Sequence, residues 1–285
     1  MAESLTIQQL LVESCQHLNQ VAGDNARLES EILLTHVLQV SRTHLIAWPE
    51  KQLSDKQVIQ IRQLVARRRQ GEPIAYLTGT REFWSLALAV TPDTLIPRAD
   101  TECLVERALA LIPEQSKAKI ADLGTGSGAI ALAIAHERRG CQITATDHSA
   151  ASLAVARSNA EQLQLTNLQF LQGNWCQALP PQATYDLIAS NPPYIAENDP
   201  HLQQGDLPFE PIGALISGPD GLDDIRLIAS EAKTHLNPGG GLLLEHGAEQ
   251  GPTVREILQQ QGYQHIQTLQ DWEQRDRLTE GFTHL

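Results

Sequence analysis

The residues best suited to chemistry are Asn191, Pro192, Pro193 and Tyr194, which directly follow the apolar segment 185–190. Proline has no N–H and forces the preceding residue into extended backbone, so two in succession present carbonyl oxygens without competing donors. The Asn191 side-chain oxygen and the Pro192 carbonyl can accept both hydrogens of a planar NH₂ group, on which Tyr194 can stack. We predict catalytic roles for Asn191, Pro192 and Tyr194 and substrate binding by all four; a rigid structural turn is the alternative.

Such a clamp suits a reaction in which the nitrogen of an NH₂ group acts as the nucleophile. The lone pair of an amide or exocyclic amine is delocalised, so an enzyme must orient the group and accept its hydrogens before the nitrogen can attack. Holding that nitrogen in line with an activated methyl group is the largest contribution we expect. The nitrogen becomes acidic once methylated and can lose its proton to water, so no strong base, triad or metal site is predicted.

A second chemical feature is the glycine-rich segment 122–128, which leaves one apolar run and opens another. Its glycines permit positive φ and a close approach of the backbone to a ligand. Because Gly124, Gly126 and Ala129 also satisfy the dinucleotide fingerprint, the loop alone predicts a nucleotide-type cofactor without naming it. A dehydrogenase has no use for an NH₂ clamp, which favours S-adenosylmethionine over a dinucleotide.

Two further positions could complete the cofactor site. Asp147 ends the next predicted strand, where its carboxylate could accept both ribose hydroxyls; a turn or helix-cap role is the alternative. Asn174 and Trp175 could meet the adenine through an amide and a ring face, although core packing of Trp175 is the competing interpretation. The predicted cofactor-binding residues are Gly124, Thr125, Gly126, Ser127, Gly128, Asp147, Trp175 and Asn191.

Alternating strands and helices are needed to bring these motifs together. Apolar runs predict strands at 119–123, 142–147, 168–171, 185–190, 241–245, 263–269 and 278–284. Amphipathic stretches predict helices at 128–138, at 149–163 with Ser149 as its cap, and at 222–236. This alternation is typical of a mostly parallel α/β sheet that binds ligands at the carboxyl ends of its strands.

The first part of the chain has a different pattern, without strand signals. Apolar stripes predict one helix around residues 10–18, a second that begins after Asn25, and a third with a capping box of Ser54 and Gln57. Residues 74–97, broken by glycine and proline, predict a β-hairpin. We therefore expect a helical domain at 1–73, a hairpin linker at 74–97 and the catalytic domain at 98–285.

Composition limits the partners and the location. The 285 residues include 21 basic and 34 acidic side chains, a formal charge of −13 that would repel a phosphate backbone. A local basic stretch at 54–81 is more typical of a solvated helix end than of a binding patch. The polar start of the chain and the short apolar runs predict no signal peptide and no membrane span. Four separated cysteines are expected to be reduced, and the protein to be a cytoplasmic monomer.

The segments 98–102, 122–128, 191–194 and 245–247 together resemble the bacterial release-factor glutamine methyltransferases of the PrmC/HemK type, and 68–79 and 199–210 extend the likeness along the chain. The resemblance implies a Rossmann-like, seven-stranded class I methyltransferase domain preceded by a small helical bundle that recognises the substrate. It also implies S-adenosylmethionine as the cofactor. Class I peptide-chain release factors would be the protein substrate, modified at the side-chain amide (N5) of the glutamine in their Gly-Gly-Gln motif.

Three other functions compete with this one. An adenine-N6 DNA methyltransferase would use the same kind of clamp on a flipped base. Against it, residues 191–221 contain no Lys or Arg but five acidic side chains, which suit a basic protein better than a phosphate chain. A glutamine methyltransferase for a ribosomal protein would differ only in its partner, and a regulatory nucleotide-binding module would need no clamp.

Overall fold

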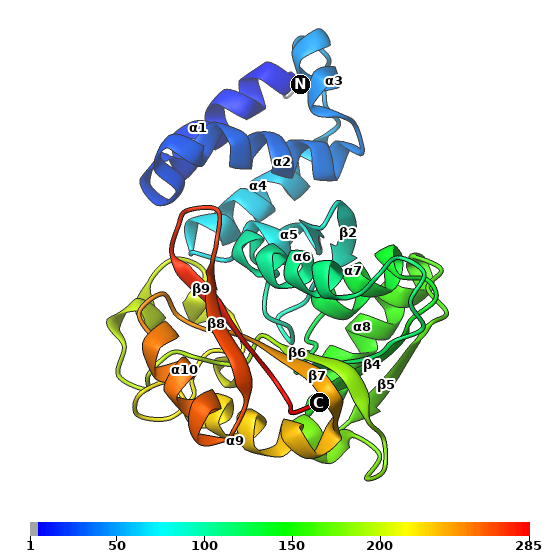
Figure 1. Ribbon diagram of the computed structural model, residues 1–285. Helices are drawn as coiled ribbons and strands as arrows, with labels where there is room; N and C mark the ends of the chain where they lie inside the picture. Colours follow the sequence, from blue (N-terminus) through cyan, green and yellow to red (C-terminus); the bar gives the residue numbers. More distant parts are fainter. Residues whose placement is uncertain (1–4) are drawn as a thin grey trace. The chain divides into compact units, whose positions relative to one another are not determined.

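The chain divides at Gly79 into two compact units (Figure 1). The structure is a computed structural model that describes residues 5–285. The first four residues, on which the expectation about a signal peptide partly rests, lie outside the described part.

The first unit is helical, as its sequence pattern predicts. Leu10, Leu18, Leu33 and Ile61 are fully buried and fill the centre of its core. The helices within residues 5–79 are α1 (Ile7–Ala22), α2 (Ala26–Leu38), α3 (Arg42–Ala47), α4 (Asp55–Arg69) and α5 (Ile74–Thr78).

The predicted caps of this unit have different outcomes. Ser54 and Gln57 form the expected capping box at the start of α4, with each side chain bonded to the backbone of the other. Asn25 does not cap α2: it ends a 3₁₀ turn in the right-handed helical region, and its side chain makes no capping bond. Helix α2 does begin directly after Asn25, as predicted, but without a side-chain cap because the chain is already helical when it reaches Asn25.

The hairpin occupies a narrower range than predicted. Residues Ile74–Thr78 form helix α5, and the strands are β1 (Thr80–Phe83) and β2 (Leu86–Ala89). The tight turn between them holds Trp84 and Ser85 at φ of 52° and 58°. The buried hairpin residues belong to the core of the second unit.

Within residues 80–285, seven strands form one sheet in the order β5-β4-β3-β6-β7-β9-β8, which confirms the predicted seven-stranded fold. β9 runs antiparallel to both of its neighbours, β7 and β8, and the other strand pairs of the sheet are parallel. The strands are β3 (Lys119–Leu123), β4 (Gln142–Asp147), β5 (Leu168–Gln172), β6 (Tyr185–Ser190), β7 (Leu236–Glu245), β8 (Gln264–Gln270) and β9 (Asp276–Phe282).

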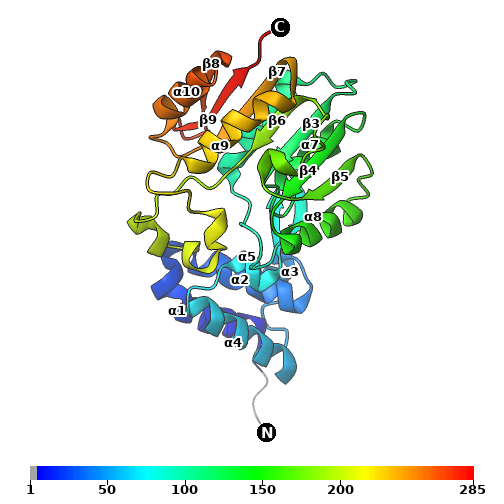
Figure 2. The ribbon, with the colours of Figure 1, turned by 90° about the horizontal axis from the view of Figure 1, so that it is seen from below.

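Helices cover both faces of this sheet (Figures 1 and 2). Alternate strand residues point to opposite sides: Ile120 and Leu187 belong to one buried cluster, whereas Ala121 and Ile188 belong to the other. The first cluster is covered by α6 (Glu102–Leu111), α7 (Ala129–Glu137) and α8 (Ala150–Gln162). The second is covered by α9 (Asp223–Ala232) and α10 (Gly251–Gln260). Such a sheet leaves the carboxyl ends of its strands open for a site.

Candidate active site

The predicted motifs meet at one edge of the sheet. β3 lies between β4 and β6, and Leu123 is paired with Thr146 on one side and with Ser190 on the other. The glycine loop, Asp147 and Asn191 follow these three residues directly in the sequence. They therefore leave the sheet at the same level, at the carboxyl ends of adjacent parallel strands.

The glycine loop has the backbone geometry that its composition predicts. Gly124, Gly126 and Gly128 have φ values of 72°, 56° and 90°, which glycine adopts without steric strain. The Gly128 N–H donates to the Thr125 carbonyl at 2.8 Å and closes the turn. Ser127 is buried, and its carbonyl accepts a hydrogen bond from α8 at 2.9 Å. The loop is thus fixed at the start of α7, where a helix terminus can receive a polar ligand.

Asp147 is buried and bonded to the loop rather than free. One carboxylate oxygen accepts from the Gly126 N–H at 2.9 Å and the other from the Ser149 N–H at 2.8 Å. The cap of α8 is the Ser149 hydroxyl, which accepts from Ser152, so the Ser149 prediction is confirmed. A carboxylate has about four acceptor positions, so Asp147 keeps capacity for a pair of hydroxyl groups.

Trp175 lies beside the glycine loop. A Cβ atom placed on Gly124 would be 2.7 Å from its Cζ3, so the ring occupies the space that a side chain would need. The indole N–H donates to Asp224 Oδ1 at 3.0 Å, and the ring packs against the core under α9. Packing of Trp175 is therefore real, and the same ring borders the predicted cofactor loop. Asn174 is exposed and makes no capping bond.

Asp122 is a functional candidate that the sequence reasoning did not select. It is fully buried; Oδ2 accepts from the Thr125 hydroxyl at 2.6 Å and the Ala131 N–H at 3.1 Å. Its other oxygen, Oδ1, has no hydrogen-bond partner among the described residues. Burial raises the pKa of this carboxyl to about 7, against the hydrogen bonds that lower it. Its position immediately before the glycine loop was the signal that could have identified it.

Asn191 is held by a residue distant in sequence. Its Nδ2 donates to the Thr101 hydroxyl at 3.1 Å, and Thr101 is buried at the start of α6. An amide whose nitrogen is committed in this way has its oxygen left to accept hydrogen bonds. Pro192 and Pro193 are both buried behind it. The Asn191 side-chain oxygen is therefore the end of the amide that is free of this contact.

The backbone after the two prolines is anchored by other loops. The Tyr194 carbonyl accepts from Gln250 Nε2 at 3.0 Å. A Cβ on Gly221 would lie 2.3 Å from that same carbonyl oxygen, so the two segments are in close contact. The Ile195 N–H donates to the Leu215 carbonyl at 2.9 Å. These contacts hold the tyrosine end of the motif in place.

Two further polar groups, Glu210 and Glu245, lie near the Asn191 motif. Glu210 pairs with Arg98 and accepts a hydrogen bond from the Ile96 N–H at 3.0 Å. These contacts connect the residues just before the 3₁₀ helix η2 (Ala99–Thr101) with the segment that follows the Asn191–Tyr194 motif. Burial raises the pKa of the Glu245 carboxyl at the end of β7 to about 7, against hydrogen bonds from the Thr101 and Tyr194 hydroxyls that lower it. Neither Arg98 nor Glu245 was included in the predicted site.

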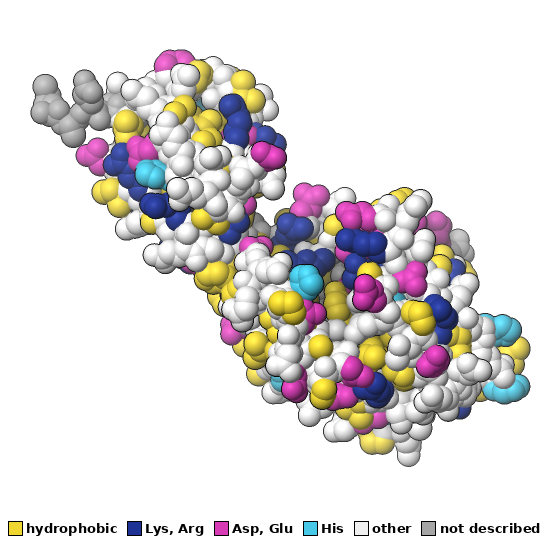
Figure 3. Space-filling view, turned by 90° about the vertical axis from the view of Figure 1, so that its left-hand side faces the viewer, with side chains coloured by type: hydrophobic (Ala, Val, Ile, Leu, Met, Phe, Trp, Pro, Cys, Tyr) yellow, Lys and Arg dark blue, Asp and Glu magenta, His cyan; other side chains and the backbone are white. Residues whose placement is uncertain are grey.

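The basic stretch of the first unit is largely neutralised. Arg62 bonds Glu13 at 2.7 Å, Arg68 bonds Glu29 at 2.8 Å, and Arg67 pairs with Glu72. On the face shown in Figure 3, basic side chains likewise lie beside acidic ones. This supports a solvated helix surface rather than a patch for nucleic acid.

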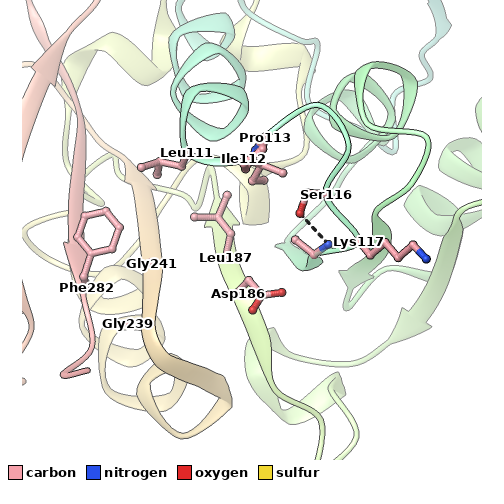
Figure 4. Close-up of a pocket in the computed structure, with 11 residues that line it drawn as sticks. Leu111, Ile112, Pro113, Ser116, Lys117, Asp186, Leu187, Gly239, Gly241 and Phe282 are labelled. Carbon is pink, nitrogen blue, oxygen red and sulfur yellow. Dashed lines mark hydrogen bonds between the residues drawn. The ribbon is translucent and has the colours of Figure 1, made fainter.

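A cavity of about 450 Å³ lies at the opposite edge of the sheet (Figure 4). It is lined by the end of α6 and the segment between α6 and β3, by the beginning of β6, by glycines of β7, and by Phe282. Its carboxylate, Asp186, is already bonded by the Lys119 N–H at 2.8 Å and by Asn237 Nδ2 at 2.7 Å. None of the predicted site residues lines this cavity, so we do not assign it to the active site.

The strand order and the glycine loop after β3 are those of a class I methyltransferase, the class that uses S-adenosylmethionine. Residues 114–281 match the family model described as "Methyltransferase domain", and residues 9–79 match "PrmC N-terminal domain". The methyltransferase fold also recurs in a solved methyltransferase from Pyrococcus furiosus, with a TM-score of 0.54 and 20% identity over 79% of this chain and 98% of that one.

Closer relatives specify the family. The chain is 50% identical to the release factor glutamine methyltransferase of Escherichia coli K12, over 91% of this chain and 93% of the relative. It is 48% identical to the protein of that name from Vibrio cholerae, over 98% of this chain and 97% of the relative. The chain belongs to the release factor glutamine methyltransferase family. Within residues 5–285, no helix is both long enough and apolar enough to cross a bilayer.

Proposed function

We propose that this protein transfers a methyl group from S-adenosylmethionine to the side-chain amide nitrogen (N5) of the glutamine in the Gly-Gly-Gln motif of class I peptide-chain release factors. The observation that carries the proposal is the orientation of Asn191, whose nitrogen is bonded to Thr101 beside the glycine loop. Its oxygen is thereby left to receive an NH₂ group. The relatives named for this activity support the choice of substrate.

The protein's own groups act on the substrate amide. Asn191 Oδ1 and the Pro192 carbonyl accept its two hydrogens, and Tyr194 limits rotation of the flat group. The rigidity of the two buried prolines supports a clamp geometry that is formed before the substrate arrives. When bound, S-adenosylmethionine supplies a methyl group activated by the positive charge of its sulfonium. One N–H proton leaves the amide nitrogen to water.

The described residues suit that cofactor. Asp122 Oδ1 is a buried acceptor without a donor, which an ammonium group would satisfy. Asp147 has acceptor capacity for ribose hydroxyls, and Gly124 keeps the backbone bare beside Trp175. We propose that Gly124–Gly128, Asp147, Trp175 and Asn191 hold S-adenosylmethionine, with Asp122 added to them.

The main competitor is methylation of adenine N6 in DNA. The two substrates present the same kind of NH₂ group, so the clamp does not separate them. The charge of segment 191–221 does separate them, because its acidic side chains repel the phosphate backbone of DNA. A ribosomal protein is the remaining alternative substrate within the same chemistry.

The decisive experiment offers the purified protein radiolabelled S-adenosylmethionine together with a release factor, the same factor with its Gly-Gly-Gln glutamine changed to alanine, a ribosomal protein mixture and duplex DNA. We expect label on the unmodified release factor alone. Labelled DNA with an unlabelled release factor would overturn the proposal, and labelled ribosomal protein would redirect it.

Asn191→Ala should lower kcat for this transfer by roughly tenfold to a hundredfold, because it removes a positioned hydrogen bond to the reacting group. Calorimetry should show that the affinity for S-adenosylmethionine changes much less. Asn237→Ala is the matched control, because Asn237 bonds Asp186 at the opposite edge of the sheet. Equal effects of the two changes would contradict the role of Asn191.

We further propose that the helical unit recognises the release factor, that one chain is sufficient for activity, and that the enzyme works in the cytoplasm beside the translation machinery. The glycine loop and the clamp lie in the same chain, which supports action as a monomer. Several large apolar side chains of the helical unit are exposed, among them Val12, Ile46 and Trp48, and could contact a protein partner.

A further inference from the structure

The orientation of the Asn191 amide depends on a hydroxyl. The amide has a donating end and an accepting end of nearly equal size, so nothing in its shape decides which end faces the substrate. The 3.1 Å hydrogen bond from Asn191 Nδ2 to Thr101 Oγ1 fixes which end of the amide faces away from Thr101. Thr101 is 4% exposed, so water does not readily replace the contact.

A hydroxyl can accept from Asn191 in this way only if its own hydrogen is directed elsewhere. The Thr101 hydroxyl donates this hydrogen to the Glu245 carboxyl, which is 1% exposed. The Tyr194 hydroxyl bonds the same carboxyl. Because a carboxyl oxygen of Glu245 accepts the Thr101 hydrogen, the hydroxyl oxygen keeps a lone pair for Asn191. Glu245 thus touches both ends of the Asn191–Tyr194 motif through hydroxyl groups.

Burying this acid is unfavourable for folding unless other groups compensate it. Its oxygen Oε2 has no hydrogen-bond partner among residues 5–285. The nearby guanidinium of Arg277 is shared with Asp100 at 3.1 Å and Asp271 at 3.3 Å. The core at this position would be more easily filled by an apolar residue, so a functional reason for the carboxyl is needed.

We propose that Thr101 and Glu245 are positioning residues, which together hold the Asn191 oxygen toward the substrate amide and hold the Tyr194 hydroxyl in place. This inference rests on the proposed function, because it concerns the same clamp. Glu245 directs the Thr101 hydrogen, Thr101 fixes the Asn191 amide, and Asn191 contacts the substrate. If the chain of contacts is broken at Thr101 or at Glu245, the amide can rotate and present its donating end.

The test compares substitutions that keep or remove each polar contact. Thr101→Val preserves shape without a hydroxyl, whereas Thr101→Ser keeps the hydroxyl. Glu245→Met removes the acceptor, whereas Glu245→Gln keeps one acceptor oxygen. Thr144→Val is the matched control, because Thr144 is also buried but bonds Gln169 on the neighbouring strand, away from the clamp.

We expect Thr101→Val and Glu245→Met each to lower kcat for release-factor methylation by about tenfold, the effect of one lost hydrogen bond. The affinity for S-adenosylmethionine, measured by calorimetry, should stay near the wild-type value. Thr101→Ser, Glu245→Gln and Thr144→Val should retain most of the activity. The Thr101→Val/Glu245→Met double variant should be no slower than Glu245→Met alone, because Thr101 acts through the Asn191 amide, which Glu245→Met already frees.

Additive losses in the double variant, equal losses in Thr101→Ser and Thr101→Val, or wild-type kcat in Thr101→Val would each overturn the inference. If Thr101→Val does not fold, as judged by circular dichroism, the Glu245→Met and Glu245→Gln pair decides the question by the same comparison. Wild-type protein that labels no release factor would instead refute the proposed function. The two failures are therefore distinguishable.

Discussion

At the scale of single residues, the predicted cofactor site depends on the missing side chain of a glycine as well as on buried carboxylates. Gly124 has φ of 72° and lies against the Trp175 ring, so the backbone there can be approached only because no side chain intervenes. Asp122 and Asp147 add buried acceptors on either side of the same loop. Gly124 therefore leaves the backbone accessible, and Asp122 and Asp147 place hydrogen-bond acceptors beside it.

Gly124→Ala should weaken binding of S-adenosylmethionine by tenfold or more, because the new Cβ would lie 2.7 Å from Trp175 Cζ3 and the ring would have to move. Gly79→Ala separates this clash from backbone strain, since Gly79 has the same φ of 72° with no atom within 4 Å of the new Cβ. Both changes should cost about 1 kcal/mol of stability from strain. Isothermal calorimetry with unchanged affinity for Gly124→Ala would show that Trp175 does not define the cofactor site.

At the scale of elements, the capping box of α4 offers a direct test of local stability. Ser54→Ala should lower the free energy of unfolding of the helical unit by about 1 kcal/mol, because it removes the side-chain bond to the first turn. Asn25→Ala is the comparison, since Asn25 precedes α2 without a capping bond. Urea denaturation followed by circular dichroism should show a shift for Ser54→Ala only; equal shifts would refute the assigned difference.

The same elements show what a sequence can and cannot predict. Periodic segments predicted the seven strands and helices α1, α2, α4, α7, α8 and α9, because burial of one or both faces imposes a clear apolar pattern, but helices α6 and α10 were not predicted. Helix α3 was missed since it has six residues, of which only Leu45 is buried. The glycine loop and the Asn191 motif were recognisable because their chemistry is contiguous in the chain. Thr101 was not, because it bonds Asn191 from 90 positions away and no local pattern encodes that contact.

At the scale of the whole molecule, two buried acids make stability depend on pH. Burial raises the pKa values of Asp122 and Glu245 to about 7, from 3.8 and 4.5 respectively. An acid with a raised pKa in the folded state favours folding fully below its unfolded pKa, and this contribution is lost as the pH rises through about 7.

The Asp122→Asn/Glu245→Gln double variant should therefore lose less stability than the wild type between about pH 5 and about pH 8, by on the order of 2 kcal/mol. Asp271→Asn gives the opposite case. Burial would raise the pKa of Asp271, but hydrogen bonds from Arg275 outweigh it and lower the pKa, so Asp271 contributes stability that is lost toward acidic pH. Urea midpoints between about pH 5 and about pH 8 measure the first effect, and midpoints below about pH 4 measure the second, because the Asp271 pKa is lowered from 3.8. Parallel curves for the double variant and wild type in the upper range would contradict the first.

The proposed division of labour between the two units can be tested on the intact chain. Ile46 is 71% exposed and lines an apolar hollow of the helical unit with Val12. If this unit recognises the release factor, Ile46→Ser should raise KM for that substrate several-fold, because an apolar contact in an interface is lost. The turnover number and the affinity for S-adenosylmethionine should not change, since the glycine loop and the clamp both lie beyond Gly79.

The matched control is Ile59→Ser, which removes an exposed isoleucine, 56% accessible, that does not line this hollow. Steady-state kinetics with a release factor as the varied substrate distinguish the two surfaces. A higher KM for Ile46→Ser alone would place the partner at the hollow, and a higher KM for Ile59→Ser alone would place it along α4. An unchanged KM in both variants would mean that recognition belongs to the methyltransferase unit, where the acidic segment after the clamp is the surface already suited to a basic protein.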